Sequence, residues 1–418
     1  MRKLLARRRE REAAMPFVML TVLIDMVSIG LVIPVLPVLV GHFTDSPQEQ
    51  AFWYGAVVFV FGFANFIGSP ILGALSDAYG RRPVLLLGFC GLGLNFFATG
   101  LATQLWMLMC VRVIGGAMQS NQAVANAYVA DITPPEQRAK RFGMLGAMFG
   151  LGFIVGPVMG GLLGKIDVQL PFFVAGGMAM LNLAYGFFVL PESLPPSSRK
   201  PFDWKRATPY TALKSLTKLH GIGVLVAAIA CSALAQFVTY TSWVLYTTFK
   251  FGWDTEQNGL SLAAVGIMSV IVQGLLLGRL LKFFSPRRLA IVGLLSSSIG
   301  YFFWGFANQG WIMYAVIFGN VLGYTVQASI QSIISTAAHK DDQGATMGAV
   351  SSINSLMVVI APLFSTPLLA VSTSFVRDDW RSGAPYYLCA LLQACALTLA
   401  FIQFSRQKRR DALGHAST

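Results

Sequence analysis

Residues 73–83 read GALSDAYGRRP, and a related stretch at residues 278–288 reads GRLLKFFSPRR. In both stretches a glycine comes first and paired arginines come near the end, so Gly73 and Arg82 are spaced as Gly278 and Arg287 are. A long apolar run precedes each stretch. This internal repeat predicts two halves of parallel orientation that share one loop design.

The chain is 55% hydrophobic and only 12% charged over 418 residues, which is too little charge for a soluble protein of this size. Apolar runs near 20 residues, the length that a helix needs to cross a bilayer, recur from end to end. We predict an all-α membrane protein with twelve transmembrane helices in two six-helix pseudo-symmetric halves, at 17–40, 52–75, 83–103, 105–130, 141–164, 171–190, 221–249, 257–281, 287–307, 310–337, 344–370 and 385–404.

Three domains follow: an N-terminal half at 1–190, a central linker at 191–220 that opens with PESLPPSSRKP, and a C-terminal half at 221–418. Basic residues predict the orientation, because cytoplasmic loops carry most Lys and Arg. With the N-terminus inside, the outer loops hold only Lys165, Lys250, Arg377 and Arg381. Both termini and the linker are therefore expected to be cytoplasmic.

The net charge of +13 does not indicate nucleic-acid binding, because the basic residues lie in short loops rather than on one soluble face. The five cysteines fall inside apolar runs without metal-ligand spacing, and the four histidines lie at loops or ends. No metal site and no cofactor are expected. The sequence has no nucleophile–base pair or phosphate loop, so we do not expect an enzyme.

The motif of residues 73–83 combines an acid, a glycine and paired bases, Asp77, Gly80, Arg81 and Arg82. Gly80 permits a tight turn, and Asp77 can pair with the arginines or with helix ends as the halves rock. We interpret the motif as a gate. The alternative is simple anchoring by positive charge, which requires only the arginines.

Arg112 lies within the fourth predicted span, where a charge costs about 2.5–3.5 kcal/mol and usually faces the bundle interior. Helical spacing puts Gly116, Gln119 and Asn126 on the same side. This polar stripe predicts a cavity wall. A structural hydrogen-bond network between helices is the alternative.

The fifth span contains an ordered glycine pattern, Gly143, Gly152, Gly156-Pro157 and Gly160-Gly161. Glycines four residues apart leave one helix face without side chains, so a neighbouring helix can approach its backbone closely. Pro157 predicts a kink.

These motifs, the spans and the central loop resemble the major facilitator superfamily, specifically its twelve-span drug:H⁺ antiporters. The pattern at 143–161 is similar to that group's antiporter signature. Over residues 21–369 the chain most resembles the tetracycline/H⁺ antiporters, in stretches such as NAYVADITPPEQRAKRFG, GPVMGGLLG and FGWDTEQNGLSLAAVGI.

The resemblance implies that Asp77 and Arg81 form a gating charge cluster with Asp131, at the end of the fourth span. It also implies that Asp25 and Arg112 correspond to a first-span aspartate and a fourth-span arginine of the family.

Several positions depart from the tetracycline exporters. Asn95 and Ser297 stand at their third- and ninth-span aspartates, Ser269 at their eighth-span histidine, and Asn65 at their second-span glutamine, whereas Gln273 matches. A metal–tetracycline cation would therefore meet one membrane carboxylate where those exporters offer three.

That carboxylate, Asp25, is the acid that we place within a span. Low dielectric disfavours its charged form, so it could take a proton from outside and release it to the cytoplasm. A permanent Asp25–Arg112 pair that holds two spans together is the alternative.

Uncharged amides within the spans are the expected substrate-cavity residues: Asn65, Asn95, Gln119, Asn126, Gln236, Gln273 and Gln327.

The sequence thus predicts a secondary active transporter that exports a small amphipathic compound, a drug or tetracycline-like molecule, in exchange for protons by alternating access. The alternatives are a proton-coupled transporter of a metabolite, such as a siderophore or organic anion, and a transporter-like sensor or assembly factor. The expected partners are a small-molecule substrate, protons and the lipid bilayer. We expect a monomer in the bacterial inner membrane.

Overall fold

The computed structural model describes residues 2–119, 121–133, 135–204, 208, 223–337 and 343–415. Within these ranges the chain consists of helices and short connections, with no strand. Much of the predicted central linker, 191–220, lies outside the described residues.

Ten helices in the described ranges are long and apolar enough to cross a membrane. The tenth predicted span is a bent pair, Gly310–Gly319 and Gly323–Ile333, with 54° between the two helices. The fourth is formed by two shorter helices, α5 (Leu105–Met118) and α6 (Asn121–Ile132). The predicted spans are therefore largely helical where described, and the all-α membrane fold is confirmed. The first span also contains a turn at 33–35, between α1 and the next helix, so three spans are interrupted.

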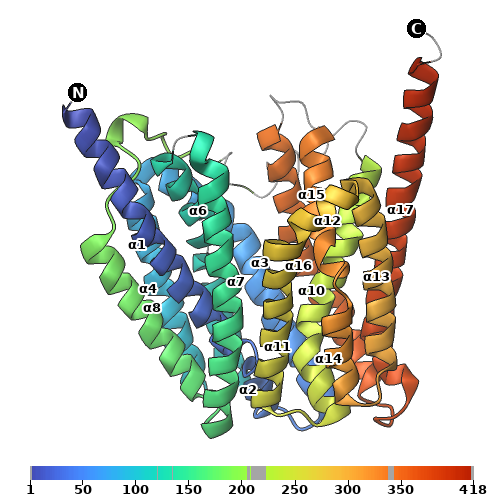
Figure 1. The fold of residues 1–418 in the computed structure, drawn as a ribbon. Coiled ribbons are helices and arrows are strands. Elements are labelled where there is room, and N and C mark those ends of the chain that lie inside the picture. Colours follow the sequence, from blue (N-terminus) through green and yellow to red (C-terminus); the bar gives the residue numbers. More distant parts are fainter. Residues whose placement is uncertain are drawn as a thin grey trace. The chain divides into compact units, whose positions relative to one another are not determined.

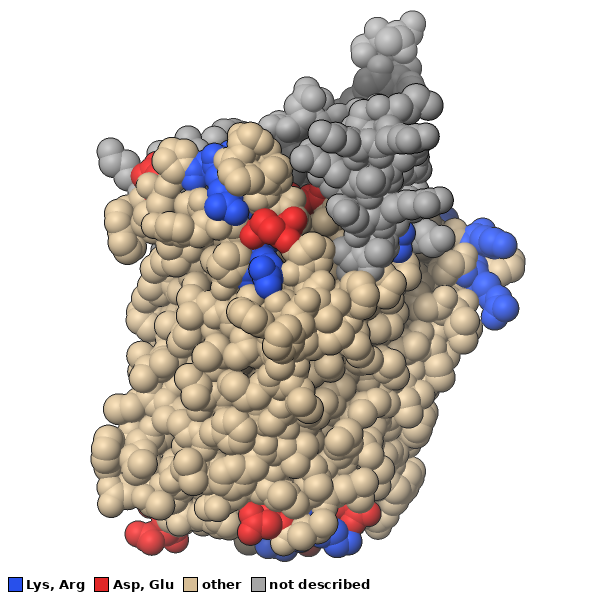
Figure 2. Space-filling model, turned by 90° about the vertical axis from the view of Figure 1, so that its left-hand side faces the viewer, with Lys and Arg blue, Asp and Glu red and all other residues tan. Residues whose placement is uncertain are grey.

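The distribution of charge agrees with a membrane-spanning fold. On the face in Figure 2, Lys, Arg, Asp and Glu gather toward the two ends, and a broad zone between them carries none. Hydrocarbon can cover such a zone without burying charge.

The chain divides into two compact units. Unit 1 comprises Met1–Ser46, Ala56–Thr211 and Trp253–Ile267, and unit 2 comprises Pro47–Gly55, Ala212–Gly252 and Met268–Thr418.

Unit 1 is built around α1 (Arg2–Val32), which packs against α7 (Pro135–Ile166) and α8 (Leu170–Val189) (Figure 1). Its core contains Val22, Phe89, Tyr128 and Leu145. Its other elements are α2 (Leu36–Gly41), most of α3 (Pro47–Tyr79), α4 (Arg81–Gly100), α5, α6, η1 (Pro196–Ser198) and most of α11 (Thr255–Val270).

Unit 2 is built around α10 (Gly223–Phe251), which packs against α16 (Gln343–Ser372) and α17 (Ala384–His415) (Figure 1). Its other elements are the π-helical turn η2 (Ile271–Leu276), α12 (Leu277–Phe283), α13 (Pro286–Phe306), α14 (Gly310–Gly319), η3 (Gly323–Thr325), α15 (Val326–Ala337) and η4 (Trp380–Gly383).

The glycine pattern of the fifth span brings the backbones of α1 and α7 together. A Cβ at Gly156 would lie 2.6 Å from Gly30 Cα, and a Cβ at Gly152 would lie 2.5 Å from Met26 Cβ. Gly160 lies in the same way against Leu31. Because side chains are absent at these positions, α1 lies directly on α7, as the spacing predicts.

Gly161 faces a different neighbour. A Cβ there would lie 2.5 Å from Thr255 O, and Thr255 Oγ1 donates a hydrogen bond of 3.2 Å to Gly161 O. The Lys165–Glu256 ion pair, 2.5 Å long, adds a second contact between α7 and α11. One helix thus presents glycines to two partners. Gly143 lies in α7, but its surroundings are outside the described residues.

We predict that Gly156→Ala destabilises the protein by about 1–3 kcal/mol, because the added methyl group forces α1 away from α7. The matched control is Gly146→Ala in the same helix, where a Cβ would meet no described atom within 4 Å. Thermal unfolding in detergent measures the effect: Gly156→Ala should lower the midpoint by several degrees, and Gly146→Ala should not. Equal midpoints would contradict the close α1–α7 contact.

Candidate functional site

Asp25 is buried in unit 1, with a relative exposure of 5%. It lines a small cavity with side chains of α1, α4, α6 and α7, among them Val22, Leu85, Ala125 and Phe149. Apart from Asp25 and Thr21, the lining is apolar. The Asp25 side chain is therefore largely shielded from bulk water.

Arg112 of α5 is also 5% exposed. Its guanidinium carbon lies 5.6 Å from the centre of the Phe61 ring of α3. The backbones of α5 and α3 lie in close contact here because Gly116 has no side chain. A Cβ at Gly116 would collide with the backbone oxygen of Phe61. The buried cation therefore lies on an aromatic face, which compensates part of its desolvation.

Two of the predicted cavity amides meet where the fourth span is interrupted. Asn65 Nδ2 of α3 donates a 2.7 Å hydrogen bond to the backbone oxygen of Gln119, the residue after the end of α5. A side-chain amide thus satisfies a carbonyl that the broken helix leaves without an intrahelical donor.

Asn95 and Asn126 have different surroundings. Asn95 of α4 is 4% exposed and lies against α5, since a Cβ at Gly115 would meet Asn95 Oδ1. Neither its amide oxygen nor its nitrogen has a hydrogen-bond partner in the described part of the chain. Asn126 is half-buried in α6.

Unit 2 contains a polar cavity of about 50 Å³. It brings the predicted residues Gln236 and Gln327 together. Sequence reasoning missed Ser232, Gln331 and Asn354, which line the same cavity together with Ile229, Ala233, Val326 and Ile330. The spacing of Gln327 and Gln331, four residues apart on α15, is a signal that could have found the second glutamine.

Gln273 does not line this cavity. It lies in the π-helical turn η2, where its amide nitrogen donates a 2.7 Å hydrogen bond to Ser269 Oγ. Single π turns inside α-helices often occur at functional sites.

The tenth span is interrupted near Asn320, between α14 and η3. Ser296 Oγ of α13 donates a 2.7 Å hydrogen bond to Asn320 Oδ1. The fourth and tenth spans occupy corresponding places in the two predicted halves, so the interruption follows the internal repeat. Transporters use discontinuous helices of this kind near their substrate and ion sites.

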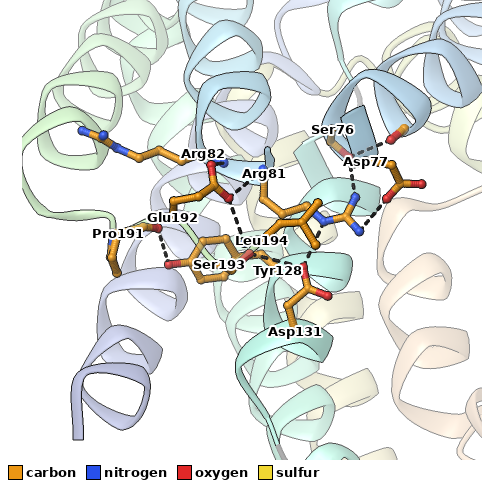
Figure 3. Close-up of polar contacts among 11 residues, drawn as sticks. Ser76, Asp77, Arg81, Arg82, Tyr128, Asp131, Pro191, Glu192, Ser193 and Leu194 are labelled. Atoms are coloured by element: carbon orange, nitrogen blue, oxygen red, sulfur yellow. Dashed lines mark hydrogen bonds and ion pairs between the residues drawn. The ribbon is translucent and has the colours of Figure 1, made fainter. Parts of the chain in front are cut away.

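The predicted gate residues form one cluster in unit 1 (Figure 3). The turn before α4 is made by Gly80, whose φ of 111° excludes most other residues. Arg81 then points back to Asp77, at 2.6 Å, and to Asp131 of α6, at 3.0 Å. Its Nη1 also donates to Ser76 Oγ.

Arg82 does not join these acids. Its guanidinium lies over the Phe187 ring at 5.7 Å and donates to Phe187 O at the end of α8. Of the paired arginines, only Arg81 connects the two carboxylates.

Glu192 is a part of this cluster that sequence reasoning missed. Its carboxylate accepts hydrogen bonds from the backbone N–H groups of Arg81 (2.9 Å) and Arg82 (3.3 Å), which are the first two residues of α4 (Figure 3). It therefore caps the positive end of that helix. A Cβ at Gly80 would collide with the Glu192 carboxylate, so the glycine is required for space as well as for φ.

The chain after α8 is held to the cluster at further points. Tyr128 OH donates to Pro191 O, Ser193 Oγ donates to Asp131 Oδ2, and Lys200 N donates to Asp77 O. The first residues of the predicted linker thus belong to the gate cluster.

The fold, the buried carboxylate and the polar cavity of unit 2 are those of a multi-span helical membrane transporter. The chain matches the family model of the Major Facilitator Superfamily over residues 18–362, with a second match over 225–412, and it belongs to that superfamily.

The chain is 34% identical to the class C tetracycline resistance protein of Escherichia coli over 89% of this chain and 93% of that protein. It is 33% identical to the class G tetracycline resistance protein of Vibrio anguillarum over 89% and 95% of the two chains. Among solved structures, a bacterial homologue of the human lysosomal transporter Spinster, inward-facing and unoccupied, gives a TM-score of 0.74 at 14% identity, with 94% and 97% coverage. The human organic anion transporter MFSD10 gives 0.68 at 21%, with 93% and 99% coverage.

We predict that Glu192→Ala lowers stability by about 0.5–2 kcal/mol, because two N–H groups at the start of α4 lose their acceptor. Ser197→Ala, an exposed change in η1, is the control. Thermal unfolding of the purified protein compares the two variants. If Glu192→Ala unfolded with the wild-type midpoint, the proposed cap would be wrong.

Proposed function

We propose that this protein exports a small amphipathic compound in exchange for protons by alternating access. The observation that carries the proposal is Asp25, a carboxylate that is buried in a mostly apolar cavity within a membrane span. An intramembrane acid of this kind is suited to carry a proton. The similarity to tetracycline resistance proteins over most of the chain supports drug export.

The proposed substrate is neutral or weakly polar. Glutamine, asparagine and serine side chains supply the polar groups of the unit 2 cavity, and they offer both donors and acceptors without demanding a charge. Asn95 and Ser297, at positions where tetracycline exporters carry aspartate, favour such a compound over a metal–tetracycline cation.

In the proposed cycle, Asp25 binds a proton from the outer side and releases it to the cytoplasm. The membrane potential contributes about 2.3 kcal/mol per charge per 100 mV to this transfer. The Asp77–Arg81–Asp131 cluster, with its 2.6 and 3.0 Å contacts, holds one conformation until it is broken. Arg112 is proposed to lower the proton affinity of Asp25 in the conformation that brings them close.

The location and assembly of the protein are part of the proposal. We place it in the bacterial inner membrane with both termini in the cytoplasm, because the basic residues of its predicted loops favour that orientation. We propose a monomer as the functional form.

Asp25→Asn should abolish drug flux driven by a pH gradient, because the amide cannot carry a proton, while substrate exchange without a gradient persists. Flux in proteoliposomes with and without an imposed gradient measures both. Asp45→Asn, at an exposed residue, is the control and should leave driven flux unchanged. Unchanged driven flux in Asp25→Asn would refute Asp25 as the proton carrier.

The double variant Gln327→Leu/Gln331→Leu should reduce export of hydrogen-bonding drugs by about tenfold relative to purely apolar ones, since it removes two amides from the cavity wall. Ser332→Ala, on the same helix and outside the cavity lining, is the matched control. A competition series of fluorescent drugs gives the ratio. An unchanged ratio would exclude these glutamines from substrate contact.

One observation favours a second function. Arg112 is a buried cation, and it suits an anionic metabolite better than a cationic drug. If proteoliposomes exchanged organic anions for protons but moved no neutral or cationic drug, this second function would replace the first. Absence of any flux would leave a sensor or assembly factor.

A further inference from the structure

A second, larger cavity lies in unit 2, where α10 and α13 end and α17 begins. Its volume is about 560 Å³. It shares no lining residue with the cavity around Gln236, and its walls are Lys250, Phe306, Asn308, Asp378, Asp379, Trp380 and Arg381. The η4 segment closes one side, because the backbones of Gly305 and Gly383 touch.

Lys250 supplies a buried cation to this cavity. The residue is only 7% exposed. Its Nζ donates to Ser382 Oγ at 2.7 Å and lies 3.5 Å from Asp379 O, while the Tyr246 ring centre is 5.9 Å away. In the described part of the chain it forms no ion pair within 4 Å, and the charges of Asp378 and Asp379 act on it from a longer distance. A buried charge in this position is stabilised strongly by an anion.

Asp379, whose backbone oxygen lies near Lys250, has its carboxylate paired with an arginine. Arg381 Nη2 lies 2.6 Å from Asp379 Oδ2, Arg381 Nε donates to both carboxylate oxygens at 3.1 Å, and Arg381 N donates to Oδ1. This guanidinium holds the pKa of the Asp379 carboxyl below its ordinary value. Asp378, in contrast, is exposed on the cavity wall.

The cavity lies at the ends of two candidate membrane spans. Phe306 ends one candidate span and Trp380 begins another, and both are more than 60% exposed. Exposed Phe302 stacks against Phe306, with 6.4 Å between the ring centres, and extends this apolar surface. Exposed aromatic residues at span ends typically mark the membrane–water interface.

We propose that this cavity binds the headgroup of a zwitterionic aminophospholipid. Its phosphate lies on the Lys250 ammonium, its amine faces Asp378, and its acyl chains follow Phe306 and Trp380 into the bilayer. With the orientation proposed above, the lipid comes from the outer leaflet. A headgroup with both charges matches a wall that presents a buried cation and an exposed acid.

Native mass spectrometry of the full-length protein tests the proposal with phosphatidylethanolamine, phosphatidylcholine and phosphatidylglycerol of identical chains. The wild type should retain phosphatidylethanolamine in preference to the other two. Lys250→Met should weaken its retention about tenfold or more, because a charge-assisted contact is lost. Lys282→Met, an exposed lysine of α12 outside the cavity, should not.

Asp378→Asn, an exposed change, should leave phosphate binding intact and remove the preference for phosphatidylethanolamine over phosphatidylglycerol. If Lys250→Met does not fold, the lipid preference of Asp378→Asn alone tests the proposal. Unaltered retention in Lys250→Met, or an unaltered preference in Asp378→Asn, would overturn the proposal. Equal thermal protection by inorganic phosphate alone would instead assign the cavity to a free phosphate.

Discussion

The direct contact between the backbones of α1 and α7 is the constraint on which unit 1 depends. Gly30 faces Gly156 at a distance that leaves no room for a methyl group on either helix. Because α1 is fixed at this point, Asp25, little more than one turn earlier, is held in the apolar cavity that α4, α6 and α7 complete. The chemistry proposed for Asp25 therefore depends on residues that have no side chains.

The fold could be predicted largely from the sequence, because in a bilayer every backbone group must be satisfied within its own helix. Length and hydropathy then decide where helices lie. The interruptions at Gln119 and Asn320 could not be predicted in this way. Neither region contains proline, and the breaks are stabilised by tertiary hydrogen bonds, which Asn65 donates to the Gln119 carbonyl and Ser296 donates to the Asn320 side chain. The pattern of apolar residues does not predict tertiary hydrogen bonds of this kind.

Some residues of the candidate site could be predicted from the sequence and others could not, for a similar reason. A charge within a span, such as Asp25 or Arg112, is visible because hydrocarbon penalises it. Glu192 was missed because it stands in a Pro/Ser-rich segment where acids are common, and its role depends on the end of a helix more than one hundred residues earlier. Gln331 and Asn354 were missed because amides tolerate both packing and cavities, so only the fold distinguishes the two. Arg81 and Arg82 are adjacent arginines that sequence alone does not distinguish, yet Arg81 pairs with Asp77 and Asp131 whereas Arg82 contacts Phe187.

Glu192 also marks the segment after α8 that remains attached to the helices of unit 1. From α8 to Lys200 the chain is attached to α4, α6 and the end of α3 by hydrogen bonds, so its length between these points is determined. An epitope, fusion partner or protease site inserted between Pro191 and Lys200 would change the chain length between the residues that make these bonds. Insertion after Lys200 leaves those bonds in place, which makes that position the natural boundary for engineering the loop.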